Sequence, residues 1–155
     1  MDDATFKARF DGDYRARYEG ASPTDFTALD FVGALGSVGD ALLYARLFLP
    51  EFAEVDGMVF LKDTVDDAGG PEGIRKSRDQ FANQRDCERS LNLFQIYLNF
   101  PNHLRESVEG DDRLLAEQLV NAWALRLRQL YPTRKFHVSV IEEDAETSVS
   151  FYQEP

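Results

Sequence analysis

The chain has 155 residues, of which 43% are apolar and 12% aromatic, and its formal net charge is −11. This length and composition are typical of a single globular domain over residues 1–155 and exclude a disordered chain. The negative charge argues against binding to nucleic acid or to an anionic membrane, because both require clustered Lys and Arg. It is compatible with a protein that docks on a basic partner.

Cys87 is the only cysteine, so no disulfide can form within the chain and a reducing compartment is the simplest setting. The first residues have neither a basic nor an apolar region, so we expect no signal peptide there. The longest apolar run, residues 41–49, contains Arg46 and is shorter than the roughly 20 residues that a membrane span needs. We therefore expect a cytoplasmic protein that does not bind membranes.

Residues 1–21 carry aromatic side chains four positions apart, with basic residues between them; the rings are Phe6, Phe10, Tyr14 and Tyr18. Taken alone, this pattern is compatible with a nucleic-acid arm. Acidic residues in the same stretch cancel its charge, however. We therefore expect the rings to dock on the core.

Two helices are predicted between residues 22 and 50. Residues 22–25, Ser-Pro-Thr-Asp, form a helix start with a capping box, and residues 37–40, Ser-Val-Gly-Asp, repeat the pattern. The glycines between the helices have the wrong spacing for a dinucleotide loop, and Asp40 stands where a phosphate loop has Lys. Ser37 lacks the first glycine and the preceding strand of a nucleophile elbow, so we interpret it as a helix cap.

A β-hairpin is predicted over residues 52–61. Asp56-Gly57 suits a turn in which both central residues have positive φ, and strand-forming residues flank it. Residues 62–70 are interpreted as an acidic loop. Pro71 then opens a polar helix that we expect to continue to about Arg89.

Residues 91–100 fit two interpretations. Alternating apolar positions favour a strand, whereas the spacing of the leucines also fits a helix that continues from Cys87. We prefer the helix, because no turn signal separates Arg89 from Leu91 and Pro101 is a natural stop.

A final amphipathic helix is predicted from Asp111 or Asp112 to Pro132, with an apolar face made of Leu115, Leu119, Trp123, Leu127 and Leu130. Two strands follow, over residues 136–140 and 147–151, because apolar and polar residues alternate in both. An acidic turn joins them. This stretch predicts a helix packed on a second hairpin.

The fold class predicted from these elements is α+β. Two β-hairpins form a four-stranded, largely antiparallel sheet, packed on one face by helices. The order helix, proline, hairpin occurs in residues 41–61 and again in residues 120–152. This order is compatible with two α-β-β units separated by a helical insert, although their sequence identity is too low to establish a repeat.

Cys87 is a candidate nucleophile only if His103 or His137 approaches it in space. The neighbouring charges of Asp86 and Glu88 raise a thiol pKa rather than lower it. We therefore interpret Cys87 as a structural residue, and His137 as the outward residue of a strand.

Metal and cofactor sites are not expected. Two histidines and one cysteine supply no zinc site of ordinary spacing, and the pair His103 and Glu106 has no evident third ligand. The acids of residues 63–67 lack the alternate spacing and the glutamate of a calcium loop.

Four arginines fall on one face of the long helix predicted from Pro71, within an arc of about 80° at 100° per residue; they are Arg75, Arg78, Arg85 and Arg89. A row of guanidinium groups can bind carboxylates or phosphates through paired hydrogen bonds. The stripe is therefore a candidate anion-binding site, and the alternative is a solvated helix face.

Acidic side chains gather at the tip of the second predicted hairpin; they are Glu142, Glu143, Asp144 and Glu146. Such a cluster can accelerate association with a basic protein, so these residues are a candidate protein-binding site. The alternative is a solvated turn that discourages pairing between strand edges.

Two functions remain open. The first is a non-enzymatic cytoplasmic protein that binds a basic protein partner, comparable to an immunity or inhibitor protein. The second is an anion-binding domain or enzyme that uses the arginine-lined helix face. Catalysis is the weaker expectation because no nucleophile or acid–base pair stands out. Self-association through surface aromatic residues is a further alternative.

Overall fold

The computed structural model describes residues 27–100, 110–143 and 146–155, and the chain divides into two units, Met1–Tyr44 and Ala45–Pro155. Helices and strands are mixed, which confirms an α+β class. The described elements before residue 50 are α2 (Ala28–Leu35) and α3 (Val38–Phe48), and α3 crosses the boundary between the units. That the chain forms one domain stays a prediction.

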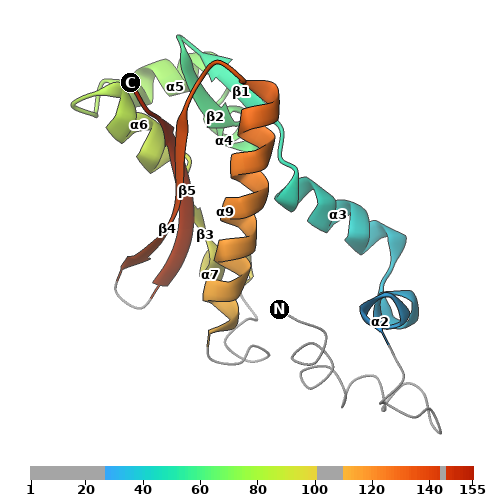
Figure 1. Ribbon diagram of the computed structural model, residues 1–155. Coiled ribbons are helices and arrows are strands. Elements are labelled where there is room, and N and C mark those ends of the chain that lie inside the picture. The colour runs from blue at the N-terminus through green and yellow to red at the C-terminus, as the bar shows by residue number, and fades with distance from the viewer. Residues whose placement is uncertain (1–26, 101–109, 144–145) are drawn as a thin grey trace, which may run out of the picture. The chain divides into compact units, whose positions relative to one another are not determined.

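The remaining elements lie in the second unit (Figure 1). In chain order they are β1 (Phe52–Val55), β2 (Met58–Leu61), α4 (Lys62–Asp67), α5 (Pro71–Arg78), α6 (Gln84–Leu91), β3 (Phe94–Gln95), α7 (Ile96–Asn99), α9 (Asp111–Leu130), β4 (Phe136–Glu143) and β5 (Glu146–Gln153). No helix in the described ranges combines the length and hydrophobicity that crossing a membrane requires.

The first hairpin forms as predicted. β1 and β2 pair antiparallel around Asp56 and Gly57, whose φ angles are +52° and +85°. Only a residue pair that tolerates the left-handed region can close so short a turn. The hairpin is anchored by Met58 and Phe60, which are buried in a cluster with Ile74 of α5.

The second hairpin also forms, and it belongs to a three-stranded antiparallel sheet of order β3-β5-β4. Alternate residues of β5 face opposite ways. Val149 and Phe151 pack with Trp123 of α9 in the largest core cluster. On the other face, the Ser150 hydroxyl donates to the carbonyl oxygen of Arg89 in α6 at 2.6 Å. Helices therefore cover both faces of this sheet (Figure 1), and the expected packing on one face alone is wrong.

The predicted four-stranded sheet is not present among the described residues; the strands form a two-stranded and a three-stranded sheet. The buried carboxylate of Glu88 in α6 explains part of the separation. Its Oε1 accepts from the backbone N–H of Val59 in β2 at 2.7 Å, and its Oε2 accepts from the backbone N–H of Gln153 in β5 at 2.8 Å. A side chain thus occupies the place where the two strands would otherwise bond.

Asn92, one helical turn further on, completes the separation. Its Oδ1 accepts from the N–H of Leu61 at 3.0 Å, and its Nδ2 donates to the carbonyl oxygens of Val59 at 3.0 Å and Phe151 at 3.4 Å. Asn92 has no exposed surface. The backbone groups of β2 that point away from β1 are therefore satisfied by side chains instead of by β5.

The continuous helix predicted from Pro71 to Arg89 is wrong, since α5 ends at Arg78 and α6 begins at Gln84. Phe81 in the intervening turn packs against the core of the first hairpin. Asn83 then caps α6, its Oδ1 accepting from the N–H of Asp86 at 2.9 Å. Burial of a ring and a local cap together interrupt the helix.

Two neighbouring predictions also need correction. Residues 62–67 form a helix, α4, instead of a loop, and Lys62 donates to Asp66 one turn along it. The helix preferred for residues 91–100 is right for α7 but wrong for Phe94 and Gln95, which pair with Val149 and Ser148 of β5. The helix ends at Asn92, whose side chain bonds backbone groups of both β2 and β5.

The predicted helix caps have mixed outcomes. The hydroxyl of Ser37 accepts from the N–H of Asp40 at 3.0 Å, which confirms the cap of α3. α2 starts at a capping box of Thr27 and Asp30, whereas the start predicted at residues 22–25 lies outside the described ranges, as do the aromatic residues before it. The cap of α9 is Gly110, with φ of +91°, so a cap at Asp111 or Asp112 is wrong.

Candidate functional site

Arg75 belongs to the first hairpin rather than to an open binding surface. Its Nε and Nη2 donate to the two carboxylate oxygens of Asp56 at 3.1 and 3.2 Å, and its Nη1 donates to Glu72 at 3.3 Å. The hydrogen bond from Arg75 is the main cause that lowers the pKa of Asp56. This guanidinium therefore holds the turn and has little donor capacity left for a ligand.

Arg85 lies on the face of β5 that α6 covers. Its guanidinium carbon is 4.3 Å from the ring centre of Tyr152, and its Nη2 donates to the Tyr152 hydroxyl at 2.8 Å. His137 of β4 stacks on the same tyrosine, with ring centres 5.0 Å apart. His137 is exposed, which confirms its interpretation as an outward strand residue.

Arg78 and Arg89 are exposed, and no described residue accepts a hydrogen bond from either side chain. Arg78 ends α5, whereas Arg89 lies near the end of α6. Because the helix is interrupted, the four arginines do not form the predicted continuous stripe. Binding of an anion by these residues stays a prediction.

The acidic residues at the tip of the second hairpin lie on both faces of the sheet, because side chains alternate between the faces along a strand. Glu142 accepts from Nη1 of Arg113 in α9 at 3.2 Å. Glu143 and Glu146 face one another as the pair next to the turn, and both are exposed. Asp144 lies outside the described residues.

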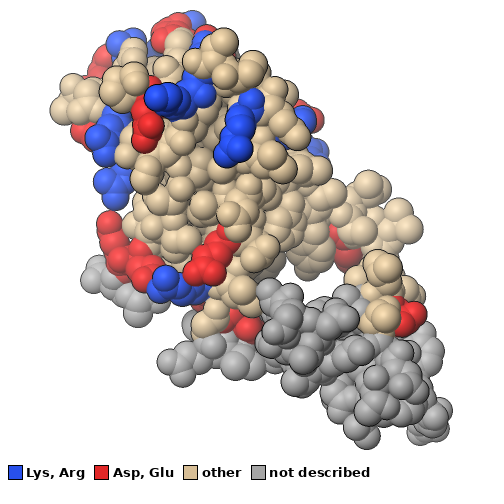
Figure 2. All heavy atoms as spheres, in the orientation of Figure 1, with Lys and Arg blue, Asp and Glu red and all other residues tan. Residues whose placement is uncertain are grey.

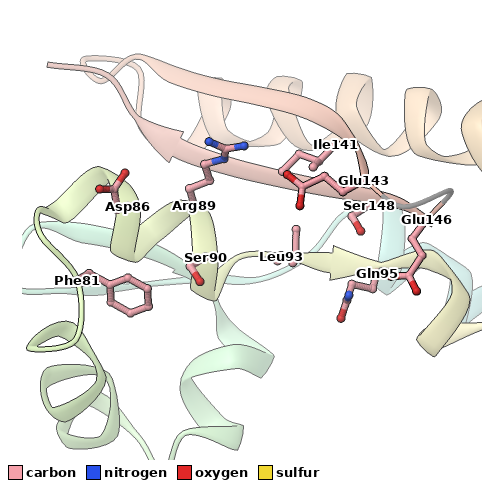
Figure 3. A pocket seen from close by; sticks show the side chains of 10 residues that line it. All are labelled: Phe81, Asp86, Arg89, Ser90, Leu93, Gln95, Ile141, Glu143, Glu146 and Ser148. Atoms are coloured by element: carbon pink, nitrogen blue, oxygen red, sulfur yellow. The ribbon is translucent and has the colours of Figure 1, made fainter.

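A groove of about 410 Å³ brings members of the two predicted sites together. Arg89 lines it from α6, and Glu143 and Glu146 line it from the hairpin, with Asp86 at the other end of α6. Figure 3 shows the Arg89 side chain reaching from α6 toward the hairpin. The groove therefore contains three carboxylates and one guanidinium.

The rest of the groove combines apolar and neutral polar groups. Phe81, Leu93 and Ile141 provide apolar surface, and Leu93 is 40% exposed although it is a large hydrophobic residue. Hydroxyl and amide groups of Ser90, Gln95 and Ser148 complete the lining (Figure 3); the last of these is buried. An elongated side chain with an apolar stem and a cationic end fits this lining chemically.

Sequence reasoning missed that one groove contains Arg89 together with Glu143 and Glu146. The alternation of β4 and β5 puts Ile141 and Glu143 on the same face as Glu146 and Ser148, and this signal was present in the sequence. The turn at residues 79–83, which directs α6 across that face, was not predicted from the sequence.

Cys87 is confirmed as a core residue. It has no exposed surface and packs with Phe60 and Ile74. Burial is the main cause that raises the pKa of its thiol, and the charge of Glu88 adds to this shift. His103, one of its two candidate bases, lies outside the described residues.

In the described part of the chain, no three His, Cys, Asp or Glu residues are grouped so that they could hold a metal ion. Comparison with known proteins gives no significant match to a family model, to a curated protein or to a solved structure.

Proposed function

We propose that the protein binds a basic protein partner and catalyses no reaction, in the manner of an immunity or inhibitor protein. The groove between α6 and the second hairpin receives a lysine or arginine side chain of that partner. The observation that carries the proposal is the presence of Asp86, Glu143 and Glu146 around one concave surface. A single guanidinium, that of Arg89, leaves this surface with an excess of negative charge.

The apolar lining supports a side chain rather than a free cation as the occupant. Leu93 and Ile141 offer surface to the methylene groups of a lysine or arginine, while the carboxylates of the hairpin receive its charged end. The net charge of −11 extends this preference beyond the groove, because long-range attraction steers a basic protein toward an acidic one. Binding of this kind weakens as ionic strength rises.

Two charge reversals of equal size test the proposal. Glu146→Lys places a positive charge in the groove, whereas Asp67→Lys makes the same change in net charge on exposed α4. Each variant and the wild type is immobilised, exposed to native lysate at low salt and eluted with a salt gradient. We expect a basic protein to be captured by the wild type and by Asp67→Lys, and lost with Glu146→Lys.

Equal capture by the two variants would show that the charge of Glu146 has no special role, and a captured partner with an acidic surface would contradict the electrostatic argument. Either result removes the groove as the binding site. A partner that elutes at the same salt concentration from the wild type and from Asp67→Lys supports it.

A second candidate function is anion binding, and one observation favours it. The guanidinium of Arg89 has no hydrogen-bonded partner among the described residues, and the hydroxyls of Ser90 and Ser148 line the same groove. A thermal-shift screen with phosphate, nucleotides and organic acids distinguishes this function from the first. We expect a rise in Tm that Arg89→Ala abolishes; no rise, or a rise that Arg89→Ala leaves unchanged, would exclude it.

A further inference from the structure

β4 is an edge strand, because β5 is the only described strand that pairs with it. The N–H of Glu154 donates to the carbonyl oxygen of Lys135 at 2.9 Å, which fixes the residues of β4 that bond to β5. In an antiparallel pair these residues alternate. The backbone groups that point away from β5 therefore belong to Phe136, Val138, Val140 and Glu142.

This edge lacks the usual protection against strand pairing. Natural edge strands carry Lys, Pro, a bulge or inward charges. Residues 136–141 contain none of the charged side chains Lys, Arg, Asp or Glu, no proline, and an unbroken register with β5. Figure 2 shows acidic side chains gathered beside the hairpin tip, with uncharged atoms over the middle of the same face.

The two ends of the edge carry opposite charges. Arg134 and Lys135 precede β4, and Glu142 and Glu143 end it. We propose that β4 pairs antiparallel with β4 of a second copy of this chain, about a two-fold axis at Ser139. The three-stranded sheet then continues through both copies.

The charges favour this occupant and this register. With the axis at Ser139, Lys135 lies opposite Glu143 of the second copy, and Val138 lies opposite Val140 of the second copy. Opposite charges that face each other across two strands stabilise the pair, and like charges destabilise it. A shift by two residues in one direction places Glu143 opposite His137. The shift in the other direction places Lys135 opposite Ile141 and Arg134 opposite Glu142, but these last two side chains already bind Glu54 and Arg113 within the chain.

The position of α9 is compatible with this dimer. α9 runs along β4, since Arg113 at its start contacts Glu142 and Tyr131 after its end packs on Phe136, with ring centres 5.7 Å apart. The middle of α9 therefore lies over the middle of β4, near the proposed axis. Because α9 packs on both β4 and β5, two strand spacings separate it from α9 of the second copy, or about 10 Å. Helices pack at 8–10 Å.

The flank of α9 nearest the β4 edge is also self-complementary. Val120 and Ala124 are half-buried and lie on the same side of α9 as Arg113; together with Glu117 and Arg128 they fall within an arc of about 80°. Glu117 and Arg128 stand at the two ends of this flank. In an antiparallel pair of helices, Glu117 faces Arg128 of the second copy.

Sedimentation velocity on the purified chain over a range of concentrations tests the proposal through a charge swap. Lys135→Glu and Glu143→Lys each create two like-charged pairs in a homodimer, so we expect either variant to dimerise at least about tenfold more weakly than the wild type. An equimolar mixture of the two variants contains only opposite pairs in the heterodimer. We therefore expect the mixture to recover wild-type association.

Lys76→Glu on exposed α5 is the matched control and leaves association unchanged. Ser139→Lys places two ammonium groups at the axis and gives a monomer, and circular dichroism verifies that each variant is folded. A wild type that sediments as a monomer at every concentration overturns the proposal, as does a mixture that associates no better than its components. The measurement uses one purified protein, so its outcome is independent of the partner proposed for the groove.

Discussion

The second unit contains two strand edges that differ in how their backbone groups are satisfied. The side chains of Glu88 and Asn92 form hydrogen bonds with the edge of β2 that points away from β1. The same side chains form hydrogen bonds with the edge of β5. The outer edge of β4 has no partner among the described residues. The edge of β2 is satisfied within the chain, whereas the outer edge of β4 pairs with no strand in the described part of the chain.

The comparison shows that side chains can satisfy the backbone N–H and C=O groups of a strand edge in place of a neighbouring strand. A buried N–H without an acceptor costs about 1–3 kcal/mol, so the edge of β2 requires Glu88 and Asn92 once it is covered by α6. The β4 edge avoids this cost only while water or another strand satisfies it. Burial therefore decides which of the two edges needs a side chain.

The largest expected effect on stability comes from removing the side chain of Asn92, which bonds the edge of β2. Asn92→Ala leaves the N–H of Leu61 and the carbonyl oxygens of Val59 and Phe151 buried without partners, and we expect a loss of about 3 kcal/mol in the free energy of unfolding. Urea denaturation measures it. The control Asn121→Ala, on the exposed face of α9, should change stability by less than about 0.5 kcal/mol. Equal losses in both variants would contradict the account.

Glu88, which bonds the edge of β2, makes the stability of the fold depend on pH. Burial is the main cause that raises its pKa, and it outweighs the opposite effect of the two backbone N–H groups that donate to it. Above the unfolded pKa of roughly 4.3, the folded state therefore retains a proton that the unfolded state has lost. The stability contributed by this group is fully present below that pH and declines as the pH rises through the folded pKa.

Glu88→Gln removes this titration and leaves the other carboxylates in place. We expect the stability difference between wild type and variant to favour the wild type most at low pH and to shrink as the pH rises, by at most about 1.4 kcal/mol per pH unit. Urea denaturation between pH 4 and 8 measures it. A difference that stays constant, or that grows with pH, would show that the pKa is not raised.

A smaller effect concerns how α6 is attached to β5. The Ser150 hydroxyl satisfies the carbonyl oxygen of Arg89, one of the last in α6 that has no partner within the helix. Ser150→Ala should destabilise the protein by about 1 kcal/mol without opening either edge. Thermal unfolding measures it, and a loss as large as that of Asn92→Ala would mean that Ser150 has a further role.

Both hairpins, α3 and the long α9 could be predicted because their signals are local. Asp56-Gly57 specifies a turn, Ser37 caps a helix, and the apolar spacing around Trp123 specifies a helix face. The division into two sheets could not be predicted. It depends on Glu88, which bonds residues 29 and 65 positions away in the sequence, and no local pattern reports such contacts.

The candidate site was predicted only in part. Arg89, Glu143 and Glu146 were each singled out, but they were assigned to two separate surfaces. Their meeting in one groove depends on the turn that Phe81 and Asn83 impose between α5 and α6. The position of the turn, to which a buried ring and a helix cap both contribute, therefore determines which charges are neighbours.

Residue-resolved hydrogen exchange at two protein concentrations tests the difference between the two edges most directly. We expect the amides of Val59, Leu61 and Gln153 to be protected at both concentrations, because Glu88 and Asn92 accept from them within one chain. The amides of Val138 and Val140 should exchange freely in dilute protein and become protected as the concentration rises. Rapid exchange at Val59, or protection of Val138 and Val140 that is independent of concentration, would contradict the account.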